Sequence, residues 1–355
     1  MAAKPWLALV GGFLGAGKTT LILAAARELK RRGMRAAAIL NDQGDGLVDT
    51  HFTRANGVPA GEVTGGCFCC RLSDLINSAR DLTTASPDVI FAEPVGSCTD
   101  ISATTIRPLL RDHFDEFRLA PYSVLIDPAR ALELDAIDPN DDLGFLFRKQ
   151  IEEADLVCWT KSDLRAIPDS VFPHARRLSA KTGEGVAAWV DEILSGELAA
   201  GNTLLDIDYA RYARAEAALA WLNLDLTLDA REPHTPAMVI GPLMDEISTE
   251  LTQSGATIAH LKIIDECASG VLKAALCGNA GDPELDGALD ASPARQHQLW
   301  VNLRARGAPS VVGDIVRRAA ERLPGEIRVA RFACFQPAAP KPERTARYSS
   351  GRCVR

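Results

Sequence analysis

Short apolar runs alternate with longer amphipathic stretches through the first half of the chain. This alternation predicts an α/β fold, in which helices cover both faces of a parallel sheet. The expected strands cover residues 5–11, 35–41, 61–65, 88–93, 122–127, 155–160 and 176–179, and the clearest helices cover residues 18–32, 71–84 and 184–195. Ligands bind such sheets beyond the carboxyl ends of the strands, so the segments that follow the strands are where a site is expected.

The pattern changes in the second half, after residues 196–215, which we interpret as a linker with room for a short helix. Residues 222–228 alternate apolar and polar side chains, as a strand with one wet face does. Further strands are expected at 256–264, 270–277, 298–305 and 326–335, and helices at 238–253 and 309–323. These elements predict a smaller α+β domain, a ferredoxin-like split βαβ arrangement with an extra strand.

Two stretches show neither pattern. Residues 279–296 are rich in Gly, Asp, Pro and Ala and are expected to form a mobile loop. From Pro337 onward the chain is poor in apolar residues, which is typical of a disordered, basic tail. The expected organisation is therefore a larger domain at 1–195, a linker at 196–215, the smaller domain at 216–336 and the tail at 337–355.

Composition narrows the classes of function. The net charge of −8 argues against a general nucleic-acid binder, which needs a basic excess to neutralise phosphates. The apolar run from Trp6 to Val10 is too short for a bilayer and leads into two glycines, so neither a membrane span nor a signal peptide is expected. We expect a cytoplasmic protein whose nine cysteines stay reduced and form no disulfide framework.

A phosphate-binding pattern follows the first expected strand. Residues 12–19 read G-F-L-G-A-G-K-T and match G-x-x-x-x-G-K-[ST], which predicts the parallel sheet of a P-loop NTPase. Glycines let successive N–H groups point at phosphate oxygens, Lys18 should reach the β- and γ-phosphates, and the Thr19 hydroxyl should ligate Mg²⁺. A glycine-rich turn with a chance Gly-Lys-Thr is the alternative, which the flanking strand and helix disfavour. The expected phosphate-loop contacts are Gly12, Gly15, Ala16, Gly17, Lys18, Thr19 and Thr20.

Acidic residues follow two other expected strands. Glu93 ends the strand at 88–93 and is expected to hold a Mg²⁺-bound water. Residues 41–49 contain three acids and two glycines and resemble a switch loop that folds onto Mg²⁺ and the γ-phosphate. Asp42, as a Mg²⁺ ligand, and Asp49 are its metal- or water-facing candidates. The alternatives are a solvated acidic turn at Asp45 and a solvated carboxylate at Glu93. Lys18, Glu93, Asp42 and Asp49 form the candidate catalytic set.

Two later loops indicate guanine. Thr160-Lys161-Ser162-Asp163 fits [NT]-K-x-D, in which Asp163 accepts hydrogen bonds from guanine N1–H and N2–H₂. Adenine has no donor at N1 and would leave this carboxylate unpaired. The Lys161 stem can cover the base, and Ser179-Ala180-Lys181 fits the second guanine loop. The alternatives are a surface turn or a P-loop kinase in which both loops are accidental.

Three cysteines lie almost side by side. Cys67, Cys69 and Cys70 follow two glycines after the strand at 61–65. Thiolates suit Zn²⁺ or Co²⁺, and three of them fill three tetrahedral positions, leaving a fourth for water, a switch residue or a partner's ligand. The alternative treats them as small buried residues, as we interpret Cys158, Cys277 and Cys334.

Together these motifs resemble those of the CobW family of metallochaperone GTPases, in the same SIMIBI class as the nickel-insertion GTPases UreG and HypB. The resemblance covers residues 5–195. It rests on five motifs: the phosphate-binding sequence at 12–20, Asn-Asp-x-Gly at 41–44, Gly-Gly-Cys-Phe-Cys-Cys at 65–70, Glu93-x-x-Gly96 and Thr-Lys-Ser-Asp at 160–163. It implies that the three cysteines bind Zn²⁺ or Co²⁺ and that GTP controls transfer of the metal to a client protein, or assembly of a metallocofactor such as cobalamin.

The chain departs from the family pattern at several positions. Position 42 is Asp where the family often has Glu, Cys98 follows Glu93 closely, and the six histidines are scattered, which argues against metal storage. With no obvious arginine finger, GTP hydrolysis is expected to be slow without a partner. The second hypothesis is a GTP-gated regulatory protein with a structural metal. A homodimer is compatible with the sequence, and the client stays unassigned.

Overall fold

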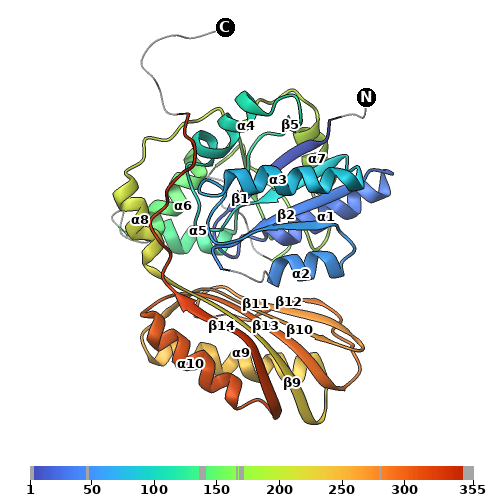
Figure 1. Ribbon diagram of the computed structural model, residues 1–355, viewed down its shortest axis with the longest axis vertical. Helices are drawn as coiled ribbons and strands as arrows, with labels where there is room; N and C mark the ends of the chain where they lie inside the picture. Colours follow the sequence, from blue (N-terminus) through green and yellow to red (C-terminus); the bar gives the residue numbers. More distant parts are fainter. Residues whose placement is uncertain are drawn as a thin grey trace. The chain divides into compact units, whose positions relative to one another are not determined.

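The computed structural model describes residues 4–44, 48–135, 141–164, 167, 172–279 and 281–346. The chain forms two compact units (Figure 1). The first contains Met1–Gln43, Asn56–Tyr212 and Pro340–Arg355, and the second contains Gly44–Ala55 and Ala213–Ala339. A short piece of the first half of the chain therefore belongs to the second unit.

A parallel sheet forms the centre of the first unit. Its strands run in the order β3-β2-β4-β1-β6-β7-β8, and the short β5 pairs with β1. The strands are β1 (Trp6–Gly12), β2 (Ala36–Asn41), β3 (Ala60–Val63), β4 (Val89–Glu93), β5 (Arg118–Leu119), β6 (Ser123–Ile126), β7 (Leu156–Trp159) and β8 (Arg176–Arg177). Every strand predicted in this half is present, and the parallel pairing is confirmed.

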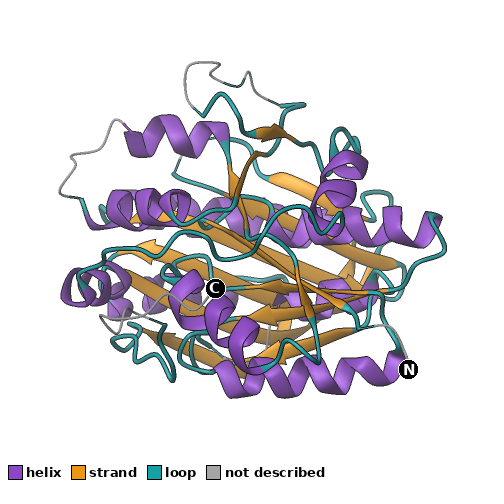
Figure 2. Ribbon diagram, turned by 90° about the horizontal axis from the view of Figure 1, so that it is seen from above, coloured by secondary structure: helices purple, strands orange, loops and turns teal. Residues whose placement is uncertain are grey.

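Helices cover this sheet because its central strand is apolar at almost every position. Residues 7–10 of β1 are at most 1% exposed, so both faces of the strand need cover. Figure 2 colours the elements by type and shows long helices, in purple, beside the strands, in orange. The helices of this part of the chain are α1 (Lys18–Arg31), α3 (Leu72–Leu82), α4 (Arg107–Asp112), α5 (Pro128–Asp135), α6 (Asp142–Glu152), α7 (Val186–Leu194) and α8 (Tyr209–Ala217), with short turns η1 (Thr83–Ala85) and η2 (Ser102–Ile106).

The strand order brings four candidate loops to one edge of the sheet. Since β3, β2, β4 and β1 are parallel neighbours, the loops that follow them leave the sheet side by side. The loop after β1 carries the phosphate-binding pattern, and the loop after β4 begins at Glu93. The loop after β2 begins the expected switch, and the loop after β3 carries the three cysteines. On the other side of β1, the loops after β7 and β8 carry the candidate guanine motifs.

The second unit has the predicted ferredoxin-like arrangement. Its antiparallel sheet has the order β12-β11-β10-β13-β9-β14, in which β14-β9-β13-β10 is the ferredoxin-like core and β11-β12 extend one edge. Its elements are α2 (Val48–Ala55), β9 (Leu219–His234), α9 (Pro236–Gln253), β10 (Thr257–Cys267), β11 (Gly270–Leu276), β12 (Glu284–Gly287), β13 (Ala294–Arg306), α10 (Pro309–Glu321) and β14 (Gly325–Phe335).

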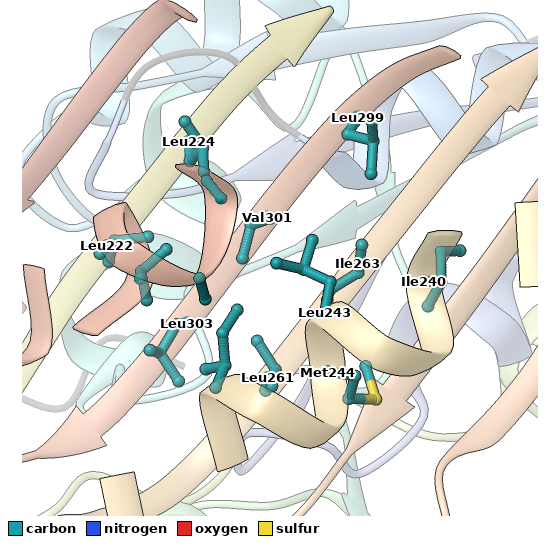
Figure 3. Packing of buried hydrophobic residues seen from close by; sticks show 14 of the residues in the cluster. Leu222, Leu224, Ile240, Leu243, Met244, Leu261, Ile263, Leu299, Val301 and Leu303 are labelled. Atoms are coloured by element: carbon teal, nitrogen blue, oxygen red, sulfur yellow. The ribbon is translucent and has the colours of Figure 1, made fainter. Parts of the chain in front are cut away.

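An apolar core joins α9 and α10 to one face of this sheet. The alternation noticed in the sequence of β9 places Leu222, Leu224, Leu226 and Leu228 in this core. Figure 3 shows the first two of these packed with leucine, isoleucine and valine side chains of β10 and β13 and with Leu243 of α9. In the described part of the chain, no helix is long and apolar enough to span a membrane.

Two expectations about irregular segments need correction. The stretch at 279–296, expected to be a mobile loop, contains β12, which pairs with β11. The tail expected to be disordered from Pro337 is ordered in part: the backbone N–H of Glu343 donates to the carbonyl of Cys69, at 2.9 Å, and that of Ala346 to the carbonyl of Ala103, at 2.8 Å. Backbone groups form these bonds whatever the side chains, so composition gives no sign of them. Residues 347–355 of the expected tail lie outside the described residues.

Candidate nucleotide-binding and metal sites

The phosphate loop holds Lys18 in a buried position at the start of α1. The Lys18 Nζ donates to the carbonyls of Gly12, at 2.9 Å, and Phe13, at 3.3 Å, and lies 3.9 Å from Oε1 of Glu93. A Cβ on Gly12 would lie 2.5 Å from the carbonyl oxygen of Leu125, and the φ of Gly12 is +132°, so glycine is required there. The ammonium group is therefore kept inside the loop, where it can exchange carbonyl oxygens for phosphate oxygens.

Thr19, in the first turn of α1, and Glu93, the last residue of β4, lie together. The Thr19 hydroxyl donates to Oε2 of Glu93 at 2.9 Å, and both residues are buried. A hydroxyl and a carboxylate are hard oxygen donors, and Mg²⁺ in phosphate sites takes few protein ligands and keeps several waters. The chemistry of these two donors fits Mg²⁺, while the roles of Thr19 as a direct ligand and of Glu93 as the holder of a bound water stay predictions.

The structure separates the two acids of the expected switch loop. Asp42 follows β2 in the first unit, where its backbone N–H donates to the carbonyl of Val63 at 3.2 Å. Asp49 lies in α2 of the second unit and forms an ion pair with Lys262. Burial raises the pKa of Asp49, but the attraction of the Lys262 ammonium outweighs this and lowers that pKa to about 2. The structure thus gives Asp49 a partner in the second unit, and its role beside Mg²⁺ stays a prediction. Residues 45–47 of this loop lie outside the described residues.

The first guanine motif is tied to the phosphate loop. The Thr160 hydroxyl lies 2.9 Å from the carbonyl oxygen of Ala16 and 3.2 Å from that of Ile126. Thr160 therefore connects the loop after β7, which we call the base loop, to the phosphate loop. It does so with a hydroxyl group, where sequences that begin this pattern with Asn have a side-chain amide. The Lys161 Nζ donates to Asp127 Oδ2 at 2.8 Å, which holds the lysine stem across the loop. Asp163, two residues after Lys161, is exposed.

The second guanine motif lies against the first. The backbone N–H of Ser162 donates to the carbonyl of Leu178 at 3.2 Å, and the Ser162 hydroxyl donates to Glu184 at 2.9 Å. Ser179 is fully buried, and its hydroxyl accepts from the backbone N–H of Thr182 at 3.1 Å. Ala180 and Lys181 follow Ser179 and are progressively more exposed.

The three cysteine sulfurs converge. The Cys67 sulfur lies 2.7 Å from that of Cys69 and 3.4 Å from that of Cys70, and 3.6 Å separates the last two. In a tetrahedral site with Zn–S distances of about 2.3 Å, sulfurs are about 3.8 Å apart. Two separations are already close to this value, and the Cys67 and Cys69 sulfurs need to part by about 1 Å. The described residues offer one cluster of three or more metal-binding side chains, and it is this one.

The protonation of the cluster is uneven. The hydrogen bond from the Cys69 thiol, with others from neighbouring thiols, holds the pKa of Cys67 well below its usual range. Cys67 as a thiolate in turn raises the pKa of Cys69 well above its usual range and the pKa of Cys70 to about 11. A metal ion that binds all three sulfurs requires the deprotonated form of each thiol, so its affinity would depend on pH.

Asn41 positions the cysteine loop, a role that the sequence did not reveal. Its amide nitrogen donates to the carbonyls of Val63, at 2.9 Å, and Gly66, at 2.7 Å, and its oxygen accepts from the backbone N–H of Phe68 at 2.9 Å. Asn41 is buried at the end of β2, directly before Asp42. The loop that carries the cysteines is therefore fixed to the strand that leads into the expected switch.

Glu153 is a fully buried carboxyl group at the carboxyl end of α6, and it gives a pH-dependent prediction. It accepts from the Thr99 hydroxyl and from the backbone N–H of Ser102, both at 3.2 Å. Burial raises its pKa to about 8. The folded state therefore binds the proton of Glu153 more tightly than the unfolded state does. The stabilisation of the folded state by this proton is complete below about pH 4.5 and is lost as the pH rises through 8. We expect the free energy of unfolding to fall by about 2 kcal/mol from pH 6 to pH 8 through this group.

Glu153→Gln should remove this pH dependence, because glutamine resembles the protonated acid. Urea denaturation at pH 6, 7 and 8 measures it, with Glu152→Gln, at the exposed neighbouring position, as the matched control. If the wild-type and Glu153→Gln proteins lose stability in parallel between pH 6 and pH 8, the assignment of the buried proton is wrong.

Comparison with known proteins matches mainly the first half of the chain. A family model described as "CobW/HypB/UreG, nucleotide-binding domain" matches residues 7–181. The zinc chaperone YjiA of Escherichia coli is 28% identical over 178 residues, which cover 49% of this chain and 54% of YjiA. The zinc chaperone CobW of a Sinorhizobium species is 28% identical over 220 residues, which cover 51% of this chain and 60% of that protein. The chain thus spans little more than half the length of these relatives.

A solved structure extends over more of the chain. The Zn(II)-bound YjiA GTPase from Escherichia coli aligns with 90% of this chain and 99% of its own, at 15% identity and a TM-score of 0.35. The family assignment depends on the matched sequence. The match includes the phosphate loop, Glu93, the three cysteines and both guanine motifs. Through residues 7–181, this chain belongs to the CobW/HypB/UreG family of nucleotide-binding domains.

Proposed function

We propose that this chain is a Mg²⁺-dependent GTPase that delivers Zn²⁺ or Co²⁺ to a client protein or to the assembly of a metallocofactor such as cobalamin. The observation that carries this proposal is the strand order β3-β2-β4-β1. It lays the cysteine loop, the switch segment, Glu93 and the phosphate loop along one edge. A change at the terminal phosphate can therefore reach the thiolates through neighbouring loops.

The nucleotide part of the proposal assigns a task to each loop. Lys18 binds the β- and γ-phosphates, while Thr19 and Glu93 hold the magnesium ion and its water. The bound Mg²⁺ would neutralise charge on the phosphate oxygens. Asp163 selects guanine, and Thr160 keeps the base loop in register with the phosphate loop through its contact with Ala16. We expect hydrolysis to be slow without a partner.

The metal part of the proposal depends on Cys67, Cys69 and Cys70. Their sulfurs lie within 4.8 Å of one another, and soft thiolates select Zn²⁺ or Co²⁺ over harder cations. The two relatives YjiA and CobW are zinc chaperones, which supports delivery as the purpose of such a site. Asn41 connects this loop to the expected switch, which supports control of metal affinity by the nucleotide.

One observation favours the second hypothesis, a regulatory GTPase with a structural metal. Cys67 and Cys69 are only 2% and 1% exposed, and buried thiolates suit a metal that stays in place. The two hypotheses differ in whether the metal affinity follows the nucleotide. Delivery requires a clear difference between the GTP and GDP states, and a structural metal requires none.

Metal titration tests the proposal directly. We expect Cys67→Ser to lower the affinity for Zn²⁺ at least about 100-fold and to abolish the sulfur-to-Co²⁺ charge-transfer absorption, because even outer-shell partners of a metal ligand are worth about 10- to 100-fold. Binding is measured with GDP and with a non-hydrolysable GTP analogue.

Cys158→Ser is the control for this titration, since burial raises the pKa of Cys158 to about 12 and keeps it a thiol. Equal affinity in both nucleotide states would support the structural metal. Charge-transfer absorption that persists in Cys67→Ser would contradict the assignment of the site.

A further inference from the structure

The loop that follows β4 contacts the phosphate loop. It begins at Glu93, whose carboxylate accepts from the Thr19 hydroxyl. Three residues later, a Cβ on Gly96 would lie 2.8 Å from the Leu14 side chain and 3.2 Å from the Leu14 backbone nitrogen. The backbone of this loop therefore packs closely against the phosphate loop, and a displacement of one is felt by the other.

The same loop ends at a cysteine that contacts the metal-binding cluster. The Cys98 thiol is hydrogen-bonded to the sulfur of Cys67 and is only 1% exposed. Its backbone is fixed independently: the Cys98 N–H donates to the carbonyl of Val95 at 2.9 Å, and the Gln150 side chain donates to the carbonyls of Cys98, at 2.8 Å, and Gly96, at 3.0 Å. These bonds hold the loop and leave the thiol to interact with the cluster.

A fourth sulfur beside three others has a plain chemical use. Zn²⁺ in proteins is almost always tetrahedral when its site is closed, and four thiolates are a common set. Cys158 is also buried, but it lies in β7, which is on the other side of β1 from β3 and its cysteine loop. Cys98 touches Cys67 without lying within 4.8 Å of all three clustered sulfurs, so it has to approach when the metal binds.

We propose that Cys98 is the fourth sulfur ligand of the metal held by Cys67, Cys69 and Cys70. This proposal rests on the proposed function and specifies its metal site. On binding, the cation replaces the proton of the Cys98 thiol, which passes to solvent, and a Zn–S bond forms. Because Glu93 begins the loop and Cys98 ends it, one short segment holds the Mg²⁺ site at its start and the cargo metal at its end.

X-ray absorption at the zinc edge counts the sulfur ligands of the full-length protein loaded with one equivalent of Zn²⁺. We expect four sulfurs at about 2.3 Å in the wild type. Cys98→Ser and Cys98→Ala should each show three sulfurs with one lighter ligand. Their zinc affinity, measured by competition with a chelator, should fall at least about 10-fold. Cys158→Ser should keep four sulfurs and the wild-type affinity.

Measurements of GTP binding and of the thermal transition check that the first unit of each variant is folded. Two different substitutions of Cys98 are used so that a folding defect of one of them does not decide the result. Three sulfurs in the wild type, or an unchanged ligand set and affinity in both Cys98 variants, would overturn the proposal. The function is tested separately by repeating the competition with GDP and the GTP analogue.

The outcomes of the two measurements are distinct. Four sulfurs with the same affinity in both nucleotide states keep Cys98 as a ligand and reject delivery. Three sulfurs with a nucleotide-dependent affinity reject Cys98 and keep delivery. A wild type that binds no Zn²⁺ rejects both.

Discussion

Lys18→Ala is expected to lower kcat for GTP hydrolysis by about 10²- to 10³-fold. The side chain is buried in the phosphate loop, and its ammonium group is held by two loop carbonyls within reach of Glu93. It is the cation best placed to meet the charge that develops on the γ-phosphate, and phosphoryl transfer depends mainly on such placement. Phosphate release at saturating Mg²⁺ and GTP measures the effect.

Lys30→Ala is the matched control for this substitution. Lys30 lies in the last turn of the same helix and is exposed, so its removal changes the net charge equally without touching the loop. We expect it to keep the wild-type rate. A Lys18→Ala protein that retains its thermal transition and hydrolyses GTP within about tenfold of wild type would show that the phosphate site lies elsewhere.

Asp163→Asn is expected to lower kcat/KM for GTP by at least about 100-fold and to favour xanthosine triphosphate instead. In the proposed role, the Asp163 carboxylate would accept from guanine N1–H and N2–H₂, whereas an asparagine amide can donate to the 2-oxo group of xanthine. In the Asp163→Asn variant, a guanine N–H donor would then face an amide N–H donor. Such unpaired donors select strongly against GTP.

Competition between GTP, ATP and xanthosine triphosphate for the wild type and the variant measures this exchange. Asp290→Asn, at an exposed position in the second unit, is the control that removes one carboxylate elsewhere. An Asp163→Asn protein with unchanged preference for GTP would refute guanine recognition by this loop and would favour the P-loop kinase hypothesis.

Much of the fold and the nucleotide motifs could be predicted because they depend on residues that are close together in the sequence. β1 is apolar throughout and is followed directly by the glycines and Lys18 of the phosphate loop, so a few adjacent residues carry the signal. β9 shows its buried face as alternation. The ferredoxin-like order of the second sheet follows from the sequence of strands and helices and the short, right-handed connections that join them.

The rest depends on partners far away along the chain. Asp49 resembles a metal ligand beside two glycines, but its partner is Lys262, which no local pattern indicates. The amide of Asn41 and the carboxyl group of Glu153 acquire their roles only when buried against backbone groups of other loops. Cys98 could be noticed in the sequence but not placed, because only folding brings it to Cys67.

The chain passes four times between the two units, at residues 43–44, 55–56, 212–213 and 339–340. A domain that is joined to a GTPase by one linker is released when a protease cleaves that linker once. Here two further segments connect the units covalently. One is the inserted α2 segment, which leaves the first unit after β2 and returns before β3. The other is the C-terminal segment, in which the backbone N–H of Lys341 donates a hydrogen bond to the Cys70 sulfur at 3.0 Å. The chain that enters and leaves the second unit therefore continues directly into the cysteine loop through β3, and returns to contact Cys70 after β14.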